Sequence, residues 1–489
     1  MSLIRGRTGS VTFGLIGFLF LVELTSGILQ GYYVPLISDL VVHLGIRDAD
    51  FNWFEAAQLL LSALVVPILA KLGDMFGHKR ILLVSTVFTA GASWWLAFTG
   101  DFTSFLIAWA LQGFYVVWLP LEVALIFDRG RRTGVAASTT RRAAALLVVA
   151  LEAGAIIGAL GAGRLFRAFD GNIPLTMMMP AIAVTLVFFA ILFGVPESEP
   201  LPGRSLDLVG FTILSLSLLL ITSGLTFLRI NGPGALWVYL LMLAGIALLV
   251  PWGRFELKQK DPAIDLRVLR QPNMWPVQLT AALIGISLLG AQAPLSTFAG
   301  TDPAATGYGL GLDSENRSYL IGVYLVSLIV GAVLFPLLSR LATPRVALIA
   351  ASFAVAIGYA LFLPFHDTTP QVFTNMIIAG IGCGALVGAL PSAAAAAAPR
   401  GQTGIATALT NTTKTIGGSF ASGIFAVVLA AGALQVAGST ASSLGGYLTV
   451  FAICSGGALV AAVLLFLVPK LAFSDESVEA EFESPLPTA

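Results

Sequence analysis

Three carboxylic acids lie inside long apolar stretches of the sequence: Glu23, Glu122 and Glu152. An ionised side chain at the centre of a membrane-spanning helix costs about 2.5 to 3.5 kcal/mol on insertion scales, so it normally faces a cavity or a partner. A carboxyl group in an apolar, partly hydrated pocket can load and release a proton near neutral pH. We therefore interpret these acids as candidate proton carriers, with Glu23, near the middle of its stretch, as the first choice.

Two of these acids also have a structural interpretation. Glu23 could bond to a neighbouring hydroxyl for packing alone, and Glu122, near the end of its stretch, could form an ion pair with Arg129, Arg131 or Arg132. In the second part of the chain, from Asn316 to Phe473, Asp367 is the only acid. If protons drive the protein, their site must therefore lie in the first part.

Long apolar stretches occupy most of the 489 residues and predict an all-α polytopic membrane protein. Hydrophobic residues make up 57% of the chain and charged residues 11%, where soluble domains carry about 25% charged residues. Each stretch approaches the twenty or so residues that a spanning helix needs, which predicts about fourteen transmembrane helices. The stretches are 11–42, 51–70, 81–99, 102–127, 143–166, 173–195, 207–229, 235–252, 273–300, 318–338, 345–365, 370–397, 402–433 and 444–469.

The distribution of basic residues predicts the orientation in the membrane. Roughly 20 of the 26 Lys and Arg fall in loops on one side, which predicts that this side and both chain ends are cytoplasmic, in a multi-pass protein of the plasma membrane. The net charge of zero gives no reason to expect a nucleic-acid partner. Cys383 and Cys454 lie in apolar stretches and His43, His78 and His366 are scattered, so we expect no disulfide, no metal and no cofactor.

A short charged turn between the second and third stretches predicts a conformational hinge. It contains Gly73, Asp74, Gly77, Lys79 and Arg80. Glycines permit a tight turn, and a carboxylate there can accept hydrogen bonds from a helix N-terminus or a base and release them when the chain rearranges. The turn resembles the signature loop after the second helix of the major facilitator superfamily, with Ala70 where that pattern has glycine. The resemblance implies a gating role for these five residues.

An internal repeat divides the chain. Residues 67–72 resemble residues 336–341, and a basic residue opens the following stretch in both places. Two related halves are typical of transporters that bind substrate at mid-membrane. We expect a six-helix bundle over residues 1–200, a linker with two inserted helices over 201–270, a second six-helix bundle over 271–473 and a disordered acidic tail over 474–489. This order resembles the fourteen-helix drug:proton antiporter branch of the superfamily.

Further motifs resemble that branch. Residues 152–159 resemble its fifth-helix antiporter motif, with Ala155 in place of proline; Gly154, Gly158 and Gly161 are expected to form a flat ridge for helix packing. Residues 106–113 resemble its fourth-helix motif, with Trp109 in place of arginine, and residues 411–418 its penultimate-helix pattern, in which Lys414 could pair with an acid of the first half or extend to the membrane edge. The expected substrate cavity comprises Gln30, Trp109, Gln112, Tyr115, Gln292, Asn375, Asn411 and Lys414. Trp109 could instead be an interfacial anchor.

These features favour a proton-coupled exporter of small hydrophobic or amphipathic compounds, which resembles the multidrug and antibiotic efflux proteins. Its expected partners are a small-molecule substrate, protons and the bilayer, and we expect a monomer. An importer of a small nutrient and a lipid exporter are the alternatives. Neither a cluster of catalytic residues nor a phosphate-binding glycine loop is visible, so we do not expect an enzyme.

Overall fold

The computed structural model describes residues 3–133, 137–198, 206–232, 234–259, 262, 264–397, 403–432 and 440–467. Side chains are not described for 3–15, 127–133, 137–145, 229, 395–397 and 403–408. The predicted acidic tail, 474–489, lies outside the described residues. Within the described part, the chain forms helices and no β-strand, as the apolar composition predicts.

Six membrane-length segments precede the inserted helices. Two of them contain breaks: α1 continues through the short helices η1 and α2, and α5 continues through η2 into α6. Together these elements are α1 (Leu3–Tyr32), η1 (Val34–Leu36), α2 (Ile37–Leu44), α3 (Asp48–Phe76), α4 (His78–Phe98), α5 (Phe102–Gln112), η2 (Gly113–Val117), α6 (Trp118–Thr133), α7 (Ala137–Ala168) and α8 (Ile173–Gly194). We call this part the first half.

Two long helices and then six further spans complete the described chain. Thirteen described helical segments are long and apolar enough to cross a membrane, and the shorter apolar helix α16 makes fourteen. The elements are α9 (Leu208–Asn231), α10 (Leu236–Glu256), α11 (Leu266–Leu269), α12 (Trp275–Gly285), η3 (Ile286–Gly290), α13 (Gln292–Gly300), α14 (Pro303–Thr306), α15 (Ser314–Leu341), α16 (Pro344–Ala360), α17 (Thr369–Ala397), α18 (Thr403–Ala431) and α19 (Leu444–Leu465). We call α12 to α19 the second half.

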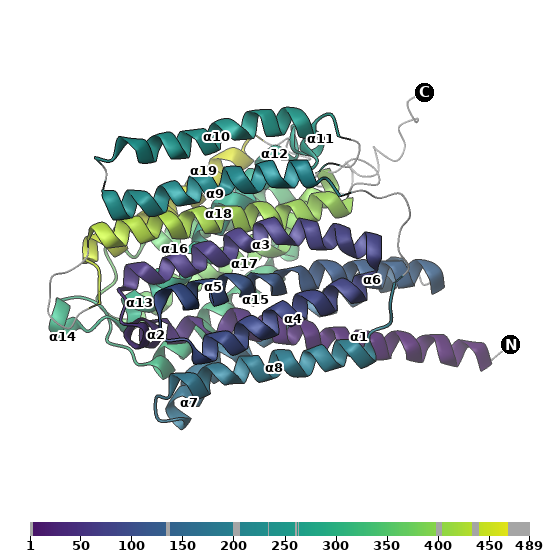
Figure 1. Cartoon of the computed structure of the whole chain (residues 1–489), viewed down its shortest axis with the longest axis horizontal. Coiled ribbons are helices and arrows are strands. Elements are labelled where there is room, and N and C mark those ends of the chain that lie inside the picture. Colours follow the sequence, from purple (N-terminus) through teal and green to yellow (C-terminus); the bar gives the residue numbers. More distant parts are fainter. Residues whose placement is uncertain are drawn as a thin grey trace.

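The hairpin of α9 and α10 lies at one edge of the molecule, beyond α18 and α3 (Figure 1). Helix α9 contacts both α18 and α3, one helix from each half. Leu214 and Leu218 of α9 pack in one apolar cluster with Leu60 of α3 and Trp252 of α10. The inserted hairpin therefore covers the seam between α3 and α18.

The central helices of each half cross at glycines. A Cβ on Gly27 of α1 would lie 1.9 Å from the carbonyl oxygen of Leu151 in α7, and one on Gly154 would lie 2.0 Å from that of Leu24. Helices α12 and α18 of the second half cross in the same way, at Gly285 and Gly417, where a Cβ would lie 2.1 and 1.9 Å from the carbonyl oxygens of Lys414 and Ala282. Only glycine allows helix backbones to approach this closely.

The two halves are joined by polar contacts at the end of the molecule that carries α2, α13 and α14, on the left of Figure 1. Arg317 of α15 donates hydrogen bonds to Asp39 of α2 and to the carbonyl oxygen of Pro35, the latter at 2.8 Å. Asp48, at the start of α3, accepts hydrogen bonds from Tyr447 OH at 2.7 Å and Thr440 Oγ1 at 2.8 Å. This end, which lies opposite the hinge between α3 and α4, is therefore sealed.

Candidate functional site

Glu23 and Glu122 lie side by side inside the first half. Both residues are completely buried, and their carboxyl groups interact with one another. When both are ionised they can only accept hydrogen bonds, and none of their four oxygens has a donor within the described part of the chain. With one proton between them, one carboxyl group becomes a donor to the other. Adjacent buried carboxyl groups of this kind are unfavourable when both are ionised.

Tyr115 of η2 links this pair to further polar side chains, Tyr33 before η1 and Gln112 of α5. Tyr115 interacts electrostatically with Glu23 and with Tyr33. Gln112 donates hydrogen bonds to Tyr33 OH at 2.7 Å and Ser93 Oγ at 3.0 Å, so the amide is held inside the first half.

Trp109 lies in an aromatic cluster within the first half. Only 2% of the residue is exposed, and its ring centroid lies 5.1 Å from that of Phe51 and 5.5 Å from that of Phe105. An interfacial anchor would need its indole at the membrane surface, so the position of Trp109 does not fit that alternative.

Glu152 of α7 and Lys414 of α18 attract each other across the two halves. The sequence alone left open whether Lys414 meets an acid of the first half or extends to the membrane edge; the structure places its charge near Glu152.

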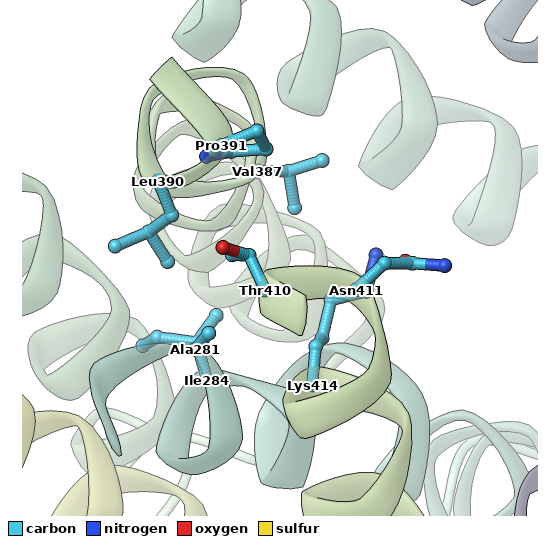
Figure 2. A pocket seen from close by; sticks show the side chains of 8 residues that line it. All are labelled: Ala281, Ile284, Val387, Leu390, Pro391, Thr410, Asn411 and Lys414. Atoms are coloured by element: carbon cyan, nitrogen blue, oxygen red, sulfur yellow. The ribbon is translucent and has the colours of Figure 1, made fainter. Parts of the chain in front are cut away.

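Lys414 also lines a small pocket within the second half. Figure 2 shows Thr410, Asn411 and Lys414 of α18 facing side chains of α12 and α17 across it. The pocket has a volume of about 30 Å³, enough for about two water molecules. Pockets for drug-sized ligands measure about 300 to 1,000 Å³, so this conformation has no room here for such a cargo.

The hinge between α3 and α4 turns at Gly77, whose φ of 102° is unfavourable for other residues. The carboxylate at the start of α4 comes from Glu197, after α8: it accepts hydrogen bonds from the backbone N–H of Lys79 at 3.0 Å and lies 3.6 Å from Arg80 Nε. Asp74 instead faces His78, with 3.3 Å between Asp74 Oδ1 and His78 Nε2. The predicted carboxylate at the helix N-terminus is thus present but belongs to Glu197.

Other predicted residues are dispersed. Gln30 is exposed on α1, and Gln292 donates only to the carbonyl oxygen of Leu288 in the preceding turn, at 3.0 Å. Asn375 is buried near the start of α17 and donates a hydrogen bond to the carbonyl oxygen of Phe365 at 2.7 Å. Gly161, expected to continue the ridge of Gly154 and Gly158, has open space where a Cβ would be. Of the predicted cavity residues, Asn411 and Lys414 are the two that line the pocket.

Three groups of functional interest were not predicted from the sequence. Glu55 is buried within α3, Glu197 follows α8 at the hinge, and Arg317 joins the halves at the sealed end. Glu55 could have been found from its spacing, because Asp48, Asn52 and Glu55 fall on one helix face. The partners of Glu197 and Arg317 come from distant parts of the chain, and no local pattern reveals them.

A membrane-embedded pair of six-span halves with a charged hinge defines a transporter. The family model of the Major Facilitator Superfamily matches residues 19–422, and the chain belongs to this family. It is a multi-pass membrane protein that moves small molecules.

The relatives of this chain include a lipid transporter and a drug-resistance protein. A triacylglyceride transporter of Mycobacterium tuberculosis is 27% identical over 444 residues, which cover 82% of this chain and 79% of that protein. The puromycin resistance protein of Streptomyces alboniger is 25% identical over 456 residues, or 87% and 85% of the two chains.

Solved structures share the fold at low sequence identity. A nucleoside transporter superposes with a TM-score of 0.63 at 12% identity, covering 97% of this chain and all of that one. A peptide transporter superposes with a TM-score of 0.64 at 15% identity, covering 93% and 96%. These likenesses concern the fold alone.

Proposed function

We propose that this protein is a proton-coupled exporter of small hydrophobic or amphipathic compounds that works by alternating access. The observation that supports this proposal best is the buried pair of Glu23 and Glu122, which lacks both a cation and a hydrogen-bond donor in the described structure. Two facing carboxylates without compensation would be strongly unfavourable, whereas a shared proton removes one charge and adds one hydrogen bond. Opening the pair to water on one side then releases the proton.

Coupling between protons and cargo requires groups that respond to the position of the halves. Glu152 and Lys414 belong to opposite halves and attract each other, so their interaction changes when the halves rock. We propose that protonation of Glu152 weakens this attraction and that Lys414 contacts the polar part of a cargo. The hinge carboxylate Asp74 stabilises one conformation through His78.

Export of apolar cargo is supported by the composition of the interior and by the relatives. The small pocket of the second half is lined by one cation, Lys414, beside the hydroxyl of Thr410, the amide of Asn411 and apolar side chains. One relative is named for puromycin resistance and others for triacylglyceride transport, so a lipid is the second candidate cargo. The hairpin of α9 and α10, which covers the seam between α3 and α18, leaves long apolar side chains such as Leu236, Leu240 and Leu243 exposed to the bilayer.

Transport by the purified protein in proteoliposomes tests the proposal. Vesicles with an imposed pH gradient are supplied with puromycin or with a fluorescent triacylglyceride. The movement of each probe in the direction opposite to proton flow is followed. We expect one of the two probes to move only when the gradient is present, and the Glu23→Gln and Glu122→Gln variants to lose this dependence. Equal movement with and without a gradient would overturn proton coupling, and accumulation in the same direction as the protons would indicate an importer.

A matched control is available in Glu256→Gln. Glu256 is a buried carboxylate of α10, 1% exposed, in the inserted hairpin outside the first half. We expect this variant to retain gradient-driven transport, which separates loss of the proton site from the general effect of removing a buried acid.

A further inference from the structure

Leu121 of α6 connects two parts of the first half, the carboxyl pair of Glu23 and Glu122 and the turn after α3. It directly precedes Glu122 in the sequence and is 1% exposed. Its side chain lies over Gly73, near the end of α3: a Cβ built on Gly73 would lie 2.7 Å from Leu121 Cδ2. Real Cβ atoms do not approach other atoms so closely, so Leu121 occupies space that only a glycine leaves open.

The turn itself is held together around His78, the first residue of α4. The point where a Cβ of Gly73 would lie is also 3.2 Å from His78 Cδ2, so Leu121 and the imidazole ring both rest against Gly73. The ring faces Asp74 Oδ1 through Nε2 at 3.3 Å, and its Nδ1 lies 2.7 Å from Ser198 Oγ, after α8. The backbone N–H of His78 also donates to Ser198 Oγ, at 2.8 Å. A movement of the turn therefore reaches the place where Leu121 is packed.

A break in the helix separates the segment that carries Leu121 and Glu122 from the earlier part of the same span. The 3₁₀ segment η2 lies between α5 and α6, and such a segment within a longer helix often marks a hinge. Pro120, in the first turn of α6, has no N–H with which to bond the carbonyl group of Val116, one turn earlier. The connection between η2 and α6 is therefore weaker than in a continuous helix.

The part of the span before this break is anchored to its neighbours. Ser62 of α3 donates to the carbonyl oxygen of Gly113, the first residue of η2, at 3.1 Å, and a Cβ on Gly113 would lie 2.7 Å from the carbonyl oxygen of Gln58. Gln112, the last residue of α5, donates to Tyr33 OH at 2.7 Å. A tilt of α6 about η2 requires none of these contacts to break.

We infer that Leu121 is a positioning residue that makes the place of Glu122 depend on the conformation of the turn after α3. While the turn holds its contacts, Leu121 keeps Glu122 against Glu23. When the turn moves, α6 tilts about η2, the two carboxyl groups separate, and a proton held between them passes to water. The inference rests on the proposed proton-coupled transport, and it adds the route by which the hinge acts on the proton site.

A double-mutant cycle between the turn and α6 tests this inference. Asp74→Asn, Leu121→Ala and the variant with both changes are compared with the native chain in proteoliposomes, using whichever of puromycin and fluorescent triacylglyceride the native chain transports. Each single variant is expected to slow gradient-driven transport about tenfold per inserted molecule, and the combined variant no more than about threefold beyond the slower single variant. Independent residues would give the product of the two effects, about a hundredfold, and that result would overturn the inference.

Proton release upon addition of the probe gives a readout that a loss of packing alone would not change. We expect Leu121→Ala to bind the probe and to release less than about half of the protons that the native protein releases, because the turn no longer sets the position of Glu122. Leu121→Met, which conserves the volume of the side chain, should restore native release. Native release in Leu121→Ala would overturn the inference.

A matched control is the truncation of a buried leucine elsewhere. Leu348 of α16 lies in the second half and is 0% exposed. We expect Leu348→Ala to keep transport and proton release within about twofold of the native values. A loss of proton release in Leu348→Ala equal to that in Leu121→Ala would show that truncation of any buried leucine has this effect, and would overturn the role of Leu121.

Gly73→Ala tests the same contact from the turn and decides the question if Leu121→Ala does not fold. The added methyl group would displace Leu121, so we expect the same loss of proton release. Gly73→Ala combined with Leu121→Val, which removes the clashing Cδ2, should recover part of it. Native release in Gly73→Ala, or no recovery in the combined variant, would contradict the contact as the coupling element.

The failure of this inference differs from the failure of the proposed function. Native gradient-driven transport in Leu121→Ala and Gly73→Ala, with transport lost in Glu23→Gln, would overturn the coupling through Leu121 and leave proton-coupled transport intact. Gradient-driven transport retained in Glu23→Gln and Glu122→Gln as well would overturn both.

Discussion

In the first half, α1 and α7 cross where Gly27 and Gly154 meet carbonyl oxygens, and in the second half α12 and α18 cross in the same way at Gly285 and Gly417. In α7, Leu151 and Gly154 contact α1 and are three residues apart. In α18, Lys414 and Gly417 contact α12 and are also three residues apart, so the two crossings are built in the same way. Glu152, next to Leu151, and Lys414 therefore both lie at the helix crossings of their halves. The attraction between these opposite charges runs from one half to the other.

The interiors of the halves differ in their polar chemistry. The first half encloses Glu23, Glu122 and Glu55, three buried carboxyl groups. The corresponding interior of the second half contains amides and hydroxyls with hydrogen-bond partners: Gln278 donates to Thr410 and accepts from Thr413, both at 3.0 Å. The two halves therefore share the helix crossings that define the fold. The buried carboxyl groups, in contrast, are concentrated in the first half.

The largest effect is expected from breaking the crossing that both halves share. Gly154→Leu and Gly417→Leu would drive a side chain into the backbone of α1 or α12, at a cost above about 3 kcal/mol. We expect little folded protein from either variant in size-exclusion profiles after detergent extraction. Gly161→Leu, which has open space, should yield native amounts; a similar loss in all three would show that the crossings are not special.

The next largest effect is expected where the halves carry opposite charges. Glu152→Gln or Lys414→Gln leaves a partly buried charge without its partner, and we expect transport to fall by about tenfold to a hundredfold. The exchanged variant, Glu152→Lys with Lys414→Glu, restores the attraction and should recover part of the rate. An exchange no better than the single variants would argue that each residue acts independently of the other.

A smaller effect is expected at the hinge, which the first half has in full and the second half lacks. Asp74→Asn removes the charge that faces His78, and turnover should fall roughly tenfold while membrane insertion stays normal. Transport rates normalised to the amount of inserted protein measure this. Asp101→Asn, at the start of α5 on the opposite side, is the control, and native turnover in Asp74→Asn would refute a gating role.

The smallest effect is expected inside the second half. Gln278→Leu removes the hydrogen bonds with Thr410 and Thr413 and should lower the free energy of unfolding by about 1 to 3 kcal/mol without changing the pH dependence of transport. Gln292→Leu, whose amide donates to the carbonyl oxygen of Leu288 one turn earlier in the same span, should have little effect on either. An altered pH profile in Gln278→Leu would show that proton handling is shared between the halves.

The helices, the hinge and the family could be predicted from the sequence because each is indicated by a pattern of neighbouring residues. Apolar stretches of spanning length identify the membrane segments, and the glycines and charges of residues 73–80 identify the turn. Both are properties of neighbouring residues.

Several parts of the site could not be predicted in this way. That Glu23 lies against Glu122, and that Glu197 rather than Asp74 meets the start of α4, depends on how distant helices pack. Trp109 is enclosed by Phe51 and Phe105 for the same reason. Glu55 was within reach of helix periodicity, because Asp48, Asn52 and Glu55 share one helix face.

The central claim is that the pair of Glu23 and Glu122 binds the proton that drives transport. The most direct measurement is proton release from the purified protein, followed with a pH-sensitive dye when the transported probe is added to the native chain and to the Glu23→Gln, Glu122→Gln double variant. We predict that the native protein releases protons as it takes up the probe and that the double variant binds the probe without releasing any. Equal proton release from both proteins would contradict the account.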